Sequence, residues 1–525
     1  MRPAAVASLG VGGEIPRVIR PGAFILLLAA ARPLAAQGAS PYLPLDHWAM
    51  PIVEHLITRG VVTDPTPLSR PFLERDLIRA LRAADTLALT GAERRAVSAI
   101  LADLAPADSG AWDRLDAHLS SLTSNSPLRD PLEQGRALPV HQFGALRGYV
   151  SGGIDARATL GNVVLVTDPY FDTRLKADPD YLGKKDRAIA GRIAEAYLAA
   201  QWRYGDLFFG ALDRNWGPPA VQGLEVSPAP YSYDHFAIGI GTPTVRLEGL
   251  MTQLDDLADT SGTVAHRYLV VHRLLIHPRG ATTFSLWEGE IIAGPGRQLE
   301  PWFANILKLG LLEQYDQGSK MNSQLGLDLT TAAGPVRLFG QFMLDDIQID
   351  RRVAGDKEPP SYGATLGAQG ALGAGGVAWT AYYTRVANLT YRTPNPAEAV
   401  MRRGVGLARN FSDYDQATVT ASLLAGPGIL FAPEVTVVRQ GEGDFRLPYP
   451  PVTAYPTTPT IFAGVVQRTL RFALSASRAS ADWTLSASAG VHLVSNDGHV
   501  SGASKTYGVG SLTVRYNFHR AGALR

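Results

Sequence analysis

The sequence predicts an all-β transmembrane outer-membrane barrel of about 16–18 antiparallel strands, preceded by a small α-helical domain. Three observations lead to this prediction. The N-terminus has the order of regions found in a secretory signal peptide. The hydrophobic period changes from that of a helix to that of a strand near residue 147. The connections between the predicted strands alternate between short and long along the chain.

The N-terminal region has the three parts of a signal peptide. Arg17 and Arg20 precede an apolar run over residues 23–31, and small residues follow up to Ala36. The apolar run is too short to cross a bilayer as a helix, which takes about 20 residues. We therefore expect residues 1–36 to be a secretory signal peptide that is removed after Ala36.

Residues 37–105 carry apolar side chains at helical spacing. Asp46 is a candidate N-cap of a first helix, and Pro71 opens a second. Thr90 and Glu93 form a capping-box pattern before a third. The sequence therefore predicts a compact helical domain over this range.

The segment that follows, residues 106–146, is rich in proline, serine, aspartate and glycine. Such a composition is typical of connecting segments. We interpret it as a connector that contains one further helix near residues 112–122.

Beyond the connector, apolar and polar side chains alternate. Near the C-terminus, Leu512 and Val514 flank Thr513 in this pattern. Alternation predicts strands with one apolar and one polar face. We predict a barrel over 147–518, followed by a C-terminal tail over 519–525. The predicted strands are 147–158, 188–203, 206–213, 235–242, 244–253, 264–277, 281–292, 321–332, 336–345, 362–372, 377–387, 414–424, 428–439, 460–477, 482–494 and 505–518.

Connection length separates the two ends of this predicted barrel. Long connections such as 214–234 and 388–413 alternate with short ones such as Gly334-Pro335. Short periplasmic turns and long extracellular loops are typical of barrels in the bacterial outer membrane. We expect the apolar faces to contact outer-membrane lipid and the barrel-assembly machinery to insert the chain. The helical domain is expected on the periplasmic side or within the barrel.

Composition argues against two function classes. The 49 basic and 48 acidic side chains leave no basic excess to neutralise phosphates, so nucleic acid is not an expected partner. The chain has no cysteine, which excludes disulfides, thiolate metal sites and a cysteine nucleophile.

Linear motifs give no sign of catalysis. The signatures of phosphate-binding loops, serine hydrolases and zinc proteases are absent from the sequence. His266 and His272 share one strand face but are too far apart to hold one metal, and Asp255, Asp256 and Asp259 lack the spacing of a calcium loop. We expect no enzyme, cofactor or metal, with a hydrolase assembled from distant strands as a trailing alternative.

One long loop carries residue types that recognise sugars. The candidates are Asp213, Arg214, Asn215, Trp216, Tyr231 and Asp234. Guanidinium and amide groups can hydrogen-bond hydroxyls in pairs, and an aromatic face can stack on a sugar ring. The alternative is that Trp216 anchors the barrel at the membrane interface and that the neighbouring prolines shape the turn.

An ordered set of stretches completes the sequence-based picture. They are 209–218, 224–230, 234–236, 273–278, 288–290, 299–314, 339–350 and 444–451. Taken together they resemble the Wzi-type capsule assembly family. The resemblance implies a barrel whose N-terminal helices plug or pack on its periplasmic end. It also implies an outer surface that binds capsular or extracellular polysaccharide and helps attach or assemble a capsule, without turnover. A passive diffusion porin is the leading alternative.

Overall fold

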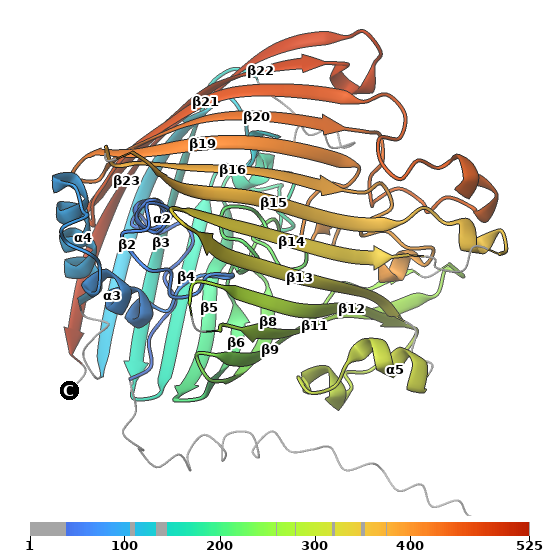
Figure 1. Cartoon of the computed structure of the whole chain (residues 1–525), viewed down its shortest axis with the longest axis horizontal. Helices are drawn as coiled ribbons and strands as arrows, with labels where there is room; N and C mark the ends of the chain where they lie inside the picture. The colour runs from blue at the N-terminus through green and yellow to red at the C-terminus, as the bar shows by residue number, and fades with distance from the viewer. Residues whose placement is uncertain are drawn as a thin grey trace, which may run out of the picture. The chain divides into compact units, whose positions relative to one another are not determined.

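The protein forms a closed antiparallel β-barrel of eighteen strands (Figure 1). The computed structural model describes residues 38–105, 111–132, 144–258, 260–278, 280–317, 321–347, 352–373 and 375–523. The predicted signal peptide, residues 1–36, lies outside the described residues. The predicted fold class, a barrel preceded by helices, is confirmed.

The barrel strands follow one another around the wall in chain order, each paired with its neighbours. They are β2 (Trp112–Ser124), β3 (Arg147–Leu160), β4 (Val163–Asp172), β5 (Ala190–Trp202), β6 (Gly205–Ala211), β8 (Asp234–Gly241), β9 (Val245–Gln253), β11 (Val264–Ile276), β12 (Thr283–Gly294), β13 (Met321–Ala333), β14 (Val336–Asp346), β15 (Ser361–Leu372), β16 (Val377–Val386), β19 (Tyr414–Gly426), β20 (Ile429–Gln440), β21 (Gln467–Ala479), β22 (Trp483–Ser495) and β23 (Ser504–Ala523). Closure comes from β2, which pairs with β3 on one side and with the last strand, β23, on the other.

Short elements complete the described chain. The helices are α2 (Met50–Thr58), α3 (Glu74–Arg82), α4 (Gly91–Leu104) and α5 (Gly310–Gln317), with 3-10 turns at η3 (Leu175–Ala177), η4 (Pro301–Ala304), η5 (Gly355–Lys357), η6 (Pro396–Glu398), η7 (Val452–Thr457) and η8 (Asp497–His499). The short strands are β1 (Ser69–Arg70), β7 (Asn215–Trp216), β10 (Leu257–Ala258), β17 (Met401–Arg402) and β18 (Val405–Gly406).

The barrel begins earlier than predicted. The helix expected near residues 112–122 is wrong, because this segment is the strand β2. Its leucines, Leu115, Leu119 and Leu122, stand at a spacing that also fits a helix face. In the strand, Leu115 and Leu119 are exposed, whereas Arg114, His118 and Ser120 on the other face are buried. The stretch assigned to a connector therefore contains the strand that closes the barrel.

Two further boundaries differ from the prediction. The stretch 159–187, predicted as a long connection in which a hairpin could be missing, contains the strand β4. Pro169 argues against a strand in the sequence, because proline cannot donate a hydrogen bond to a strand ladder. In the structure, Pro169 stands at a register shift between β4 and β5. The tail predicted over 519–525 is also wrong in its described part, since β23 continues to Ala523 and pairs with β2 there.

The two faces of the wall have the polarity expected in a membrane. On β13, Leu325, Leu327 and Leu329 are exposed on the outside, whereas Asp328 and Thr330 are buried toward the lumen. Apolar residues therefore face lipid and polar residues face inward, as in other outer-membrane barrels. Among the described residues, no helix is both long and apolar enough to span a membrane.

The helical domain forms as predicted, with the capping box in place at Thr90, but Asp46 is not the cap of the first helix, because α2 follows Ala49 without a side-chain cap. The Glu93 backbone N–H donates to Thr90 Oγ1 over 3.2 Å, and the Thr90 N–H donates to Glu93 Oε2 over 2.6 Å, which completes the capping box. Leu56, Phe72 and Ile100 belong to a core that also includes wall residues of β19 and β20. The helices lie at the barrel end that carries the short turns and the C-terminus (Figure 1).

Ion pairs and a short ladder fix this domain to the wall. Arg157 on β3 contacts Glu74 of α3 at 2.7 Å, and Arg114 on β2 contacts Asp103 of α4 at 2.9 Å. The short strand β1 pairs with β7 of the loop after β6. This loop therefore turns into the lumen and meets the helical domain there.

The other half of the lumen is also occupied. An apolar cluster joins the inward faces of the wall to the connections 212–233 and 387–413 and to Phe445. Its buried members include Trp216, Leu224, Tyr391, Leu407 and Phe411. The helical domain thus fills the lumen toward the end with the short turns. The inward-folded loops fill it toward the end with the long loops.

This filling predicts a low conductance. Open barrels of 16–18 strands leave an aqueous channel, so we expect the intact protein in planar bilayers to conduct far less than such a pore. A variant that lacks residues 38–105 should conduct only modestly more, because the loops 212–233 and 387–413 still fill the lumen toward the end with the long loops. A large, steady conductance of the intact protein would instead support the porin alternative.

Candidate functional site

Arginine side chains lie over aromatic rings around the barrel end that carries the long loops. We call this set the arginine–aromatic rim. The guanidinium carbon is 4.1 Å from the ring centroid for Arg129 over Tyr231, 4.4 Å for Arg192 over Tyr231, 5.8 Å for Arg402 over Tyr233, 5.9 Å for Arg392 over Tyr449 and 5.0 Å for Arg439 over Phe462. The attraction of a cation to the ring face holds each guanidinium group in place at the mouth.

Tyr231 contacts four charged side chains of this rim. Its hydroxyl donates to Asp178 Oδ2 over 2.6 Å and accepts from Arg174 Nη2 over 3.2 Å. Arg174 also contacts Asp178 at 2.9 Å. Because Arg129 and Arg192 both lie over its ring, Tyr231 positions cations and does not offer a free face to a sugar.

The surface beside Tyr231 is basic. Arg129 keeps 27% of its side chain exposed, and Lys184, Lys185 and Arg187 are exposed on the neighbouring loop. Acidic groups lie close to these cations: Arg129 is 3.9 Å from the buried Asp178 and 3.6 Å from Asp180, and Arg187 is 3.7 Å from the exposed Asp186. The exposed Lys184 and the exposed part of Arg129 leave cationic groups at this part of the mouth that can donate to carboxylate, sulfate or hydroxyl oxygens.

The structure divides the six predicted sugar-binding residues. Asp213 and Arg214 lie at the point where the loop turns inward. Arg214 Nε donates to His235 Nε2 over 2.8 Å, and its guanidinium group lies 4.4 Å from the ring centroid of Phe208. Burial raises the pKa of Asp213 to about 6, and the nearby charge of Arg192 opposes that rise. Arg214 therefore ties the start of the loop to the wall from within.

Asn215 and Trp216 form β7 inside the lumen. The Asn215 side chain donates to the Val221 carbonyl over 3.0 Å and accepts from the Gly223 N–H over 2.7 Å, which fixes the turn that follows. Trp216 is 7% exposed and belongs to the lumen cluster. Its ring is therefore neither at the outer surface nor in a girdle at the membrane interface, and the interfacial-anchor alternative is wrong.

Tyr231 and Asp234 remain near the mouth. Tyr231 is partly exposed and belongs to the rim, and Asp234 is exposed at the first position of β8. Sequence reasoning missed their basic neighbours. Arg129 falls in the segment assigned to the connector, and Arg192 begins a strand. The rim arginines are scattered along the sequence, and their pairing with aromatic rings depends on the order of the strands.

The inward-folded loop also carries an unusual carboxyl group. Glu225 is 2% exposed, and neither of its oxygens has a hydrogen-bond partner. Burial and the neighbouring charge of Asp345 raise the pKa of Glu225 to about 8. This group is consequently protonated at neutral pH and contributes no charge to the lumen.

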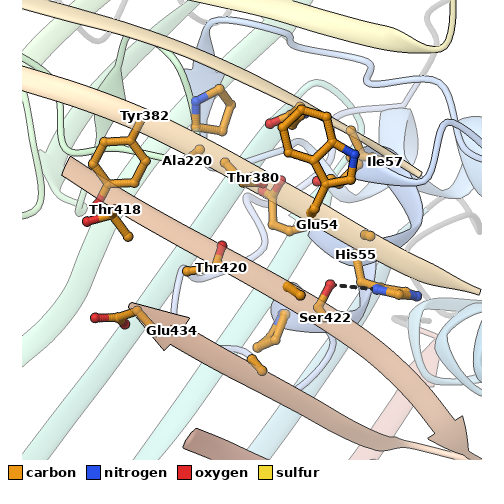
Figure 2. A pocket seen from close by; sticks show the side chains of 18 of the residues that line it. Glu54, His55, Ile57, Ala220, Thr380, Tyr382, Thr418, Thr420, Ser422 and Glu434 are labelled. Atoms are coloured by element: carbon orange, nitrogen blue, oxygen red, sulfur yellow. Dashed lines mark hydrogen bonds between the residues drawn. The ribbon is translucent and has the colours of Figure 1, made fainter. Parts of the chain in front are cut away.

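The helical domain and the wall enclose a polar cavity of about 500 Å³ (Figure 2). Thr380, Thr418, Thr420 and Ser422 project into it from β16 and β19. His55 of α2 is hydrogen-bonded to Ser422 Oγ at 2.8 Å. Hydroxyls lining a pocket of this kind suit water held in the lumen, and the helical domain bounds it on one side.

The sequence raised two candidate metal sites, a pair of histidines on one strand and a group of aspartates in one loop. His266 and His272 do not meet, because His266 contacts Asp256 and His272 contacts Glu288. Asp255 accepts the Arg403 backbone N–H over 2.7 Å, whereas Asp259 lies outside the described residues. The sequence could not show that the neighbouring strand places carboxylates beside His272.

Comparison with solved structures supports the barrel architecture. The chain is similar to Wzi, an outer-membrane protein involved in group 1 capsule assembly in Escherichia coli and described as a carbohydrate-binding β-barrel. The TM-score is 0.59 at 13% identity, and the match covers 92% of this chain and 99% of that one. A BenF-like porin from Pseudomonas fluorescens Pf-5 gives 0.45 at 11% identity over 78% of this chain and 99% of that one. No family model and no curated protein matches the sequence.

Proposed function

We propose that this outer-membrane barrel binds an acidic exopolysaccharide at its outer mouth and helps attach or assemble a capsule. The observation that carries the proposal is the arginine–aromatic rim beside exposed Lys184, Lys185 and Arg187. Guanidinium groups recognise carboxylates through paired, charge-assisted hydrogen bonds. A rim that holds these groups in place therefore suits a polymer rich in uronic acid or other acidic sugars.

The role we propose is lectin-like and non-catalytic. A lumen occupied by helices and inward-folded loops does not suit a diffusion pore, so the porin alternative has less support from this architecture. The proposal also accords with the carbohydrate-binding character of the similar Wzi barrel, although that similarity concerns the fold alone. The long-loop end faces outward in such barrels, which places the rim where a secreted polymer would meet it.

The test replaces the two guanidinium groups that lie over Tyr231. We expect the variant Arg129→Gln with Arg192→Gln to bind a polyuronate roughly tenfold more weakly, which corresponds to about 1.4 kcal/mol. Titration of fluorescent alginate against protein in nanodiscs measures this affinity, and neutral dextran serves as the comparison polymer. The affinity of the wild type should fall as salt is added, because exposed charges are screened.

The chain offers a matched control at the opposite end. Arg203 lies over Tyr204 at 5.0 Å in the short turn between β5 and β6. The substitution Arg203→Gln removes the same kind of cation–π pair there and should leave alginate binding unchanged. Both proteins are shown to be folded by heat-modifiable migration in gels. If the wild type and the double variant then bind alginate equally, the rim does not recognise the polymer.

A further inference from the structure

A buried imidazole and two carboxylates lie together on the outward face of the barrel wall. His272 on β11 is 5% exposed, and Glu288 and Glu290 on β12 are 4% and 0% exposed. One donor atom from each residue lies within 4.8 Å of the others. The register pairs His272 with Glu288, and Glu290 stands two residues further along the same face of β12.

The direction of this face follows from its neighbours. Leu286 shares the face of Glu288 and is 51% exposed, whereas Trp287 points the other way and belongs to the lumen cluster. The three side chains therefore point away from the lumen. Without a covering segment, the two carboxylates would face lipid, where an unpaired charge is costly.

The connection between β12 and β13 covers this group. We call its described part, residues 295–317, the outer flap. Trp302 and Phe303 of η4 pack on Tyr268, Val270 and Ile292 of the wall. The Gly310 backbone N–H donates to Glu288 Oε1 over 2.8 Å. A Cβ atom at Gly310 would meet the Glu290 carboxyl group, which shows how closely the flap backbone approaches this side chain.

Three polar atoms of the group have no hydrogen-bond partner in the protein. His272 Nδ1 contacts Glu288 Oε1 at 3.1 Å, but His272 Nε2 and both oxygens of Glu290 have no hydrogen-bond partner. Within the described part of the chain, the one ion pair of Glu288 is that with His272, and Glu290 has none. Buried polar groups are normally paired, so the arrangement points to a missing cationic partner.

We propose that His272, Glu288 and Glu290 bind a divalent transition-metal ion of the Zn²⁺ class, which fixes the outer flap to the barrel wall. Imidazole nitrogen and carboxylate oxygen are ordinary Zn²⁺ ligands at about 2.0–2.2 Å. A small closure of the three side chains brings their donor atoms to such distances. Calcium fits less well, because it takes about six to eight oxygen ligands. The ion neutralises both carboxylates and leaves one position for water.

Metal analysis of the full-length protein tests this site directly. Protein in detergent is stripped with EDTA, equilibrated with Zn²⁺ and desalted, and bound zinc is measured by mass spectrometry. We expect about one Zn²⁺ per wild-type chain. The near-isosteric variant Glu290→Gln and the variant His272→Asn should each lose at least tenfold in affinity, measured by competition with a chromophoric chelator. Hydrogen exchange at the Gly310 amide should accelerate when wild-type protein is stripped.

A control on the same strand separates this site from general zinc binding. His266 and Asp256 form an exposed contact at 3.1 Å near the other end of β11. The variant His266→Gln with Asp256→Asn should retain one Zn²⁺. Wild-type protein that stays folded yet holds far less than one zinc per chain overturns the proposal, even if a variant fails to fold. Unchanged zinc affinity in Glu290→Gln overturns it as well.

Discussion

Replacement of Arg273 by methionine is expected to lower the free energy of unfolding by roughly 3–5 kcal/mol, the usual effect of breaking a buried ion pair. Arg273 is 2% exposed and projects from β11 into the lumen. Its guanidinium group donates to the Leu68 carbonyl over 2.9 Å and to Ser69 Oγ over 2.8 Å, and it lies 3.4 Å from Asp328. Methionine fills similar space but leaves the buried Asp328 charge without its cation, whereas Glu248, 3.5 Å from Arg273, keeps its ion pair with Arg246.

Denaturant unfolding in lipid vesicles, followed by tryptophan fluorescence, measures this loss. The additional substitution Asp328→Asn should restore part of the stability, because no unpaired charge then remains. Arg203→Met, at an exposed turn, should change stability by less than about 0.5 kcal/mol, as is usual for surface positions. A loss equally small for Arg273→Met would show that β1 is not held by the wall as described.

The second large effect is expected at Trp216. Truncation to alanine opens a cavity in the lumen cluster and should cost about 3–5 kcal/mol of stability. The alginate affinity of the folded fraction should stay close to that of the wild type, because the ring is 7% exposed and lies behind the mouth. Trp216→Phe, which keeps most of the apolar volume, should recover much of the stability.

This variant also decides between two interpretations of the residue. Unfolding measurements and alginate titration are made on the same preparation. Loss of alginate binding with unchanged stability would restore the sequence-based hypothesis that Trp216 contacts polysaccharide. Loss of stability with retained binding would assign the residue to the lumen.

The barrel itself could be predicted because the same patterns of side-chain alternation and connection length recur along the chain. The alternation at positions such as Leu512 and Val514 indicates a strand with one lipid-facing side. The alternation of short and long connections indicates which strand ends lie on the same side of the membrane. The capping box at Thr90 is likewise local and was predicted correctly. The two strands that were missed each contained a conflicting local signal, helical leucine spacing in β2 and Pro169 in β4.

The candidate site was harder because it depends on contacts between distant segments. A long loop at residues 214–234 identifies its end of the barrel, but not whether it folds outward or into the lumen. Pairing of β7 with β1 sends Trp216 inward, and pairing across the mouth brings Arg129 to Tyr231. The group at His272 likewise depends on the register of β11 and β12. None of these relations leaves a periodic trace in the sequence.

The most direct test of the central claim is binding of labelled alginate by wild-type protein in nanodiscs, followed by fluorescence anisotropy. We expect saturable binding that unlabelled alginate, but not neutral dextran, competes away and that weakens as salt rises. Absence of saturable binding at low salt by protein shown to be folded would contradict the proposed recognition of acidic polysaccharide.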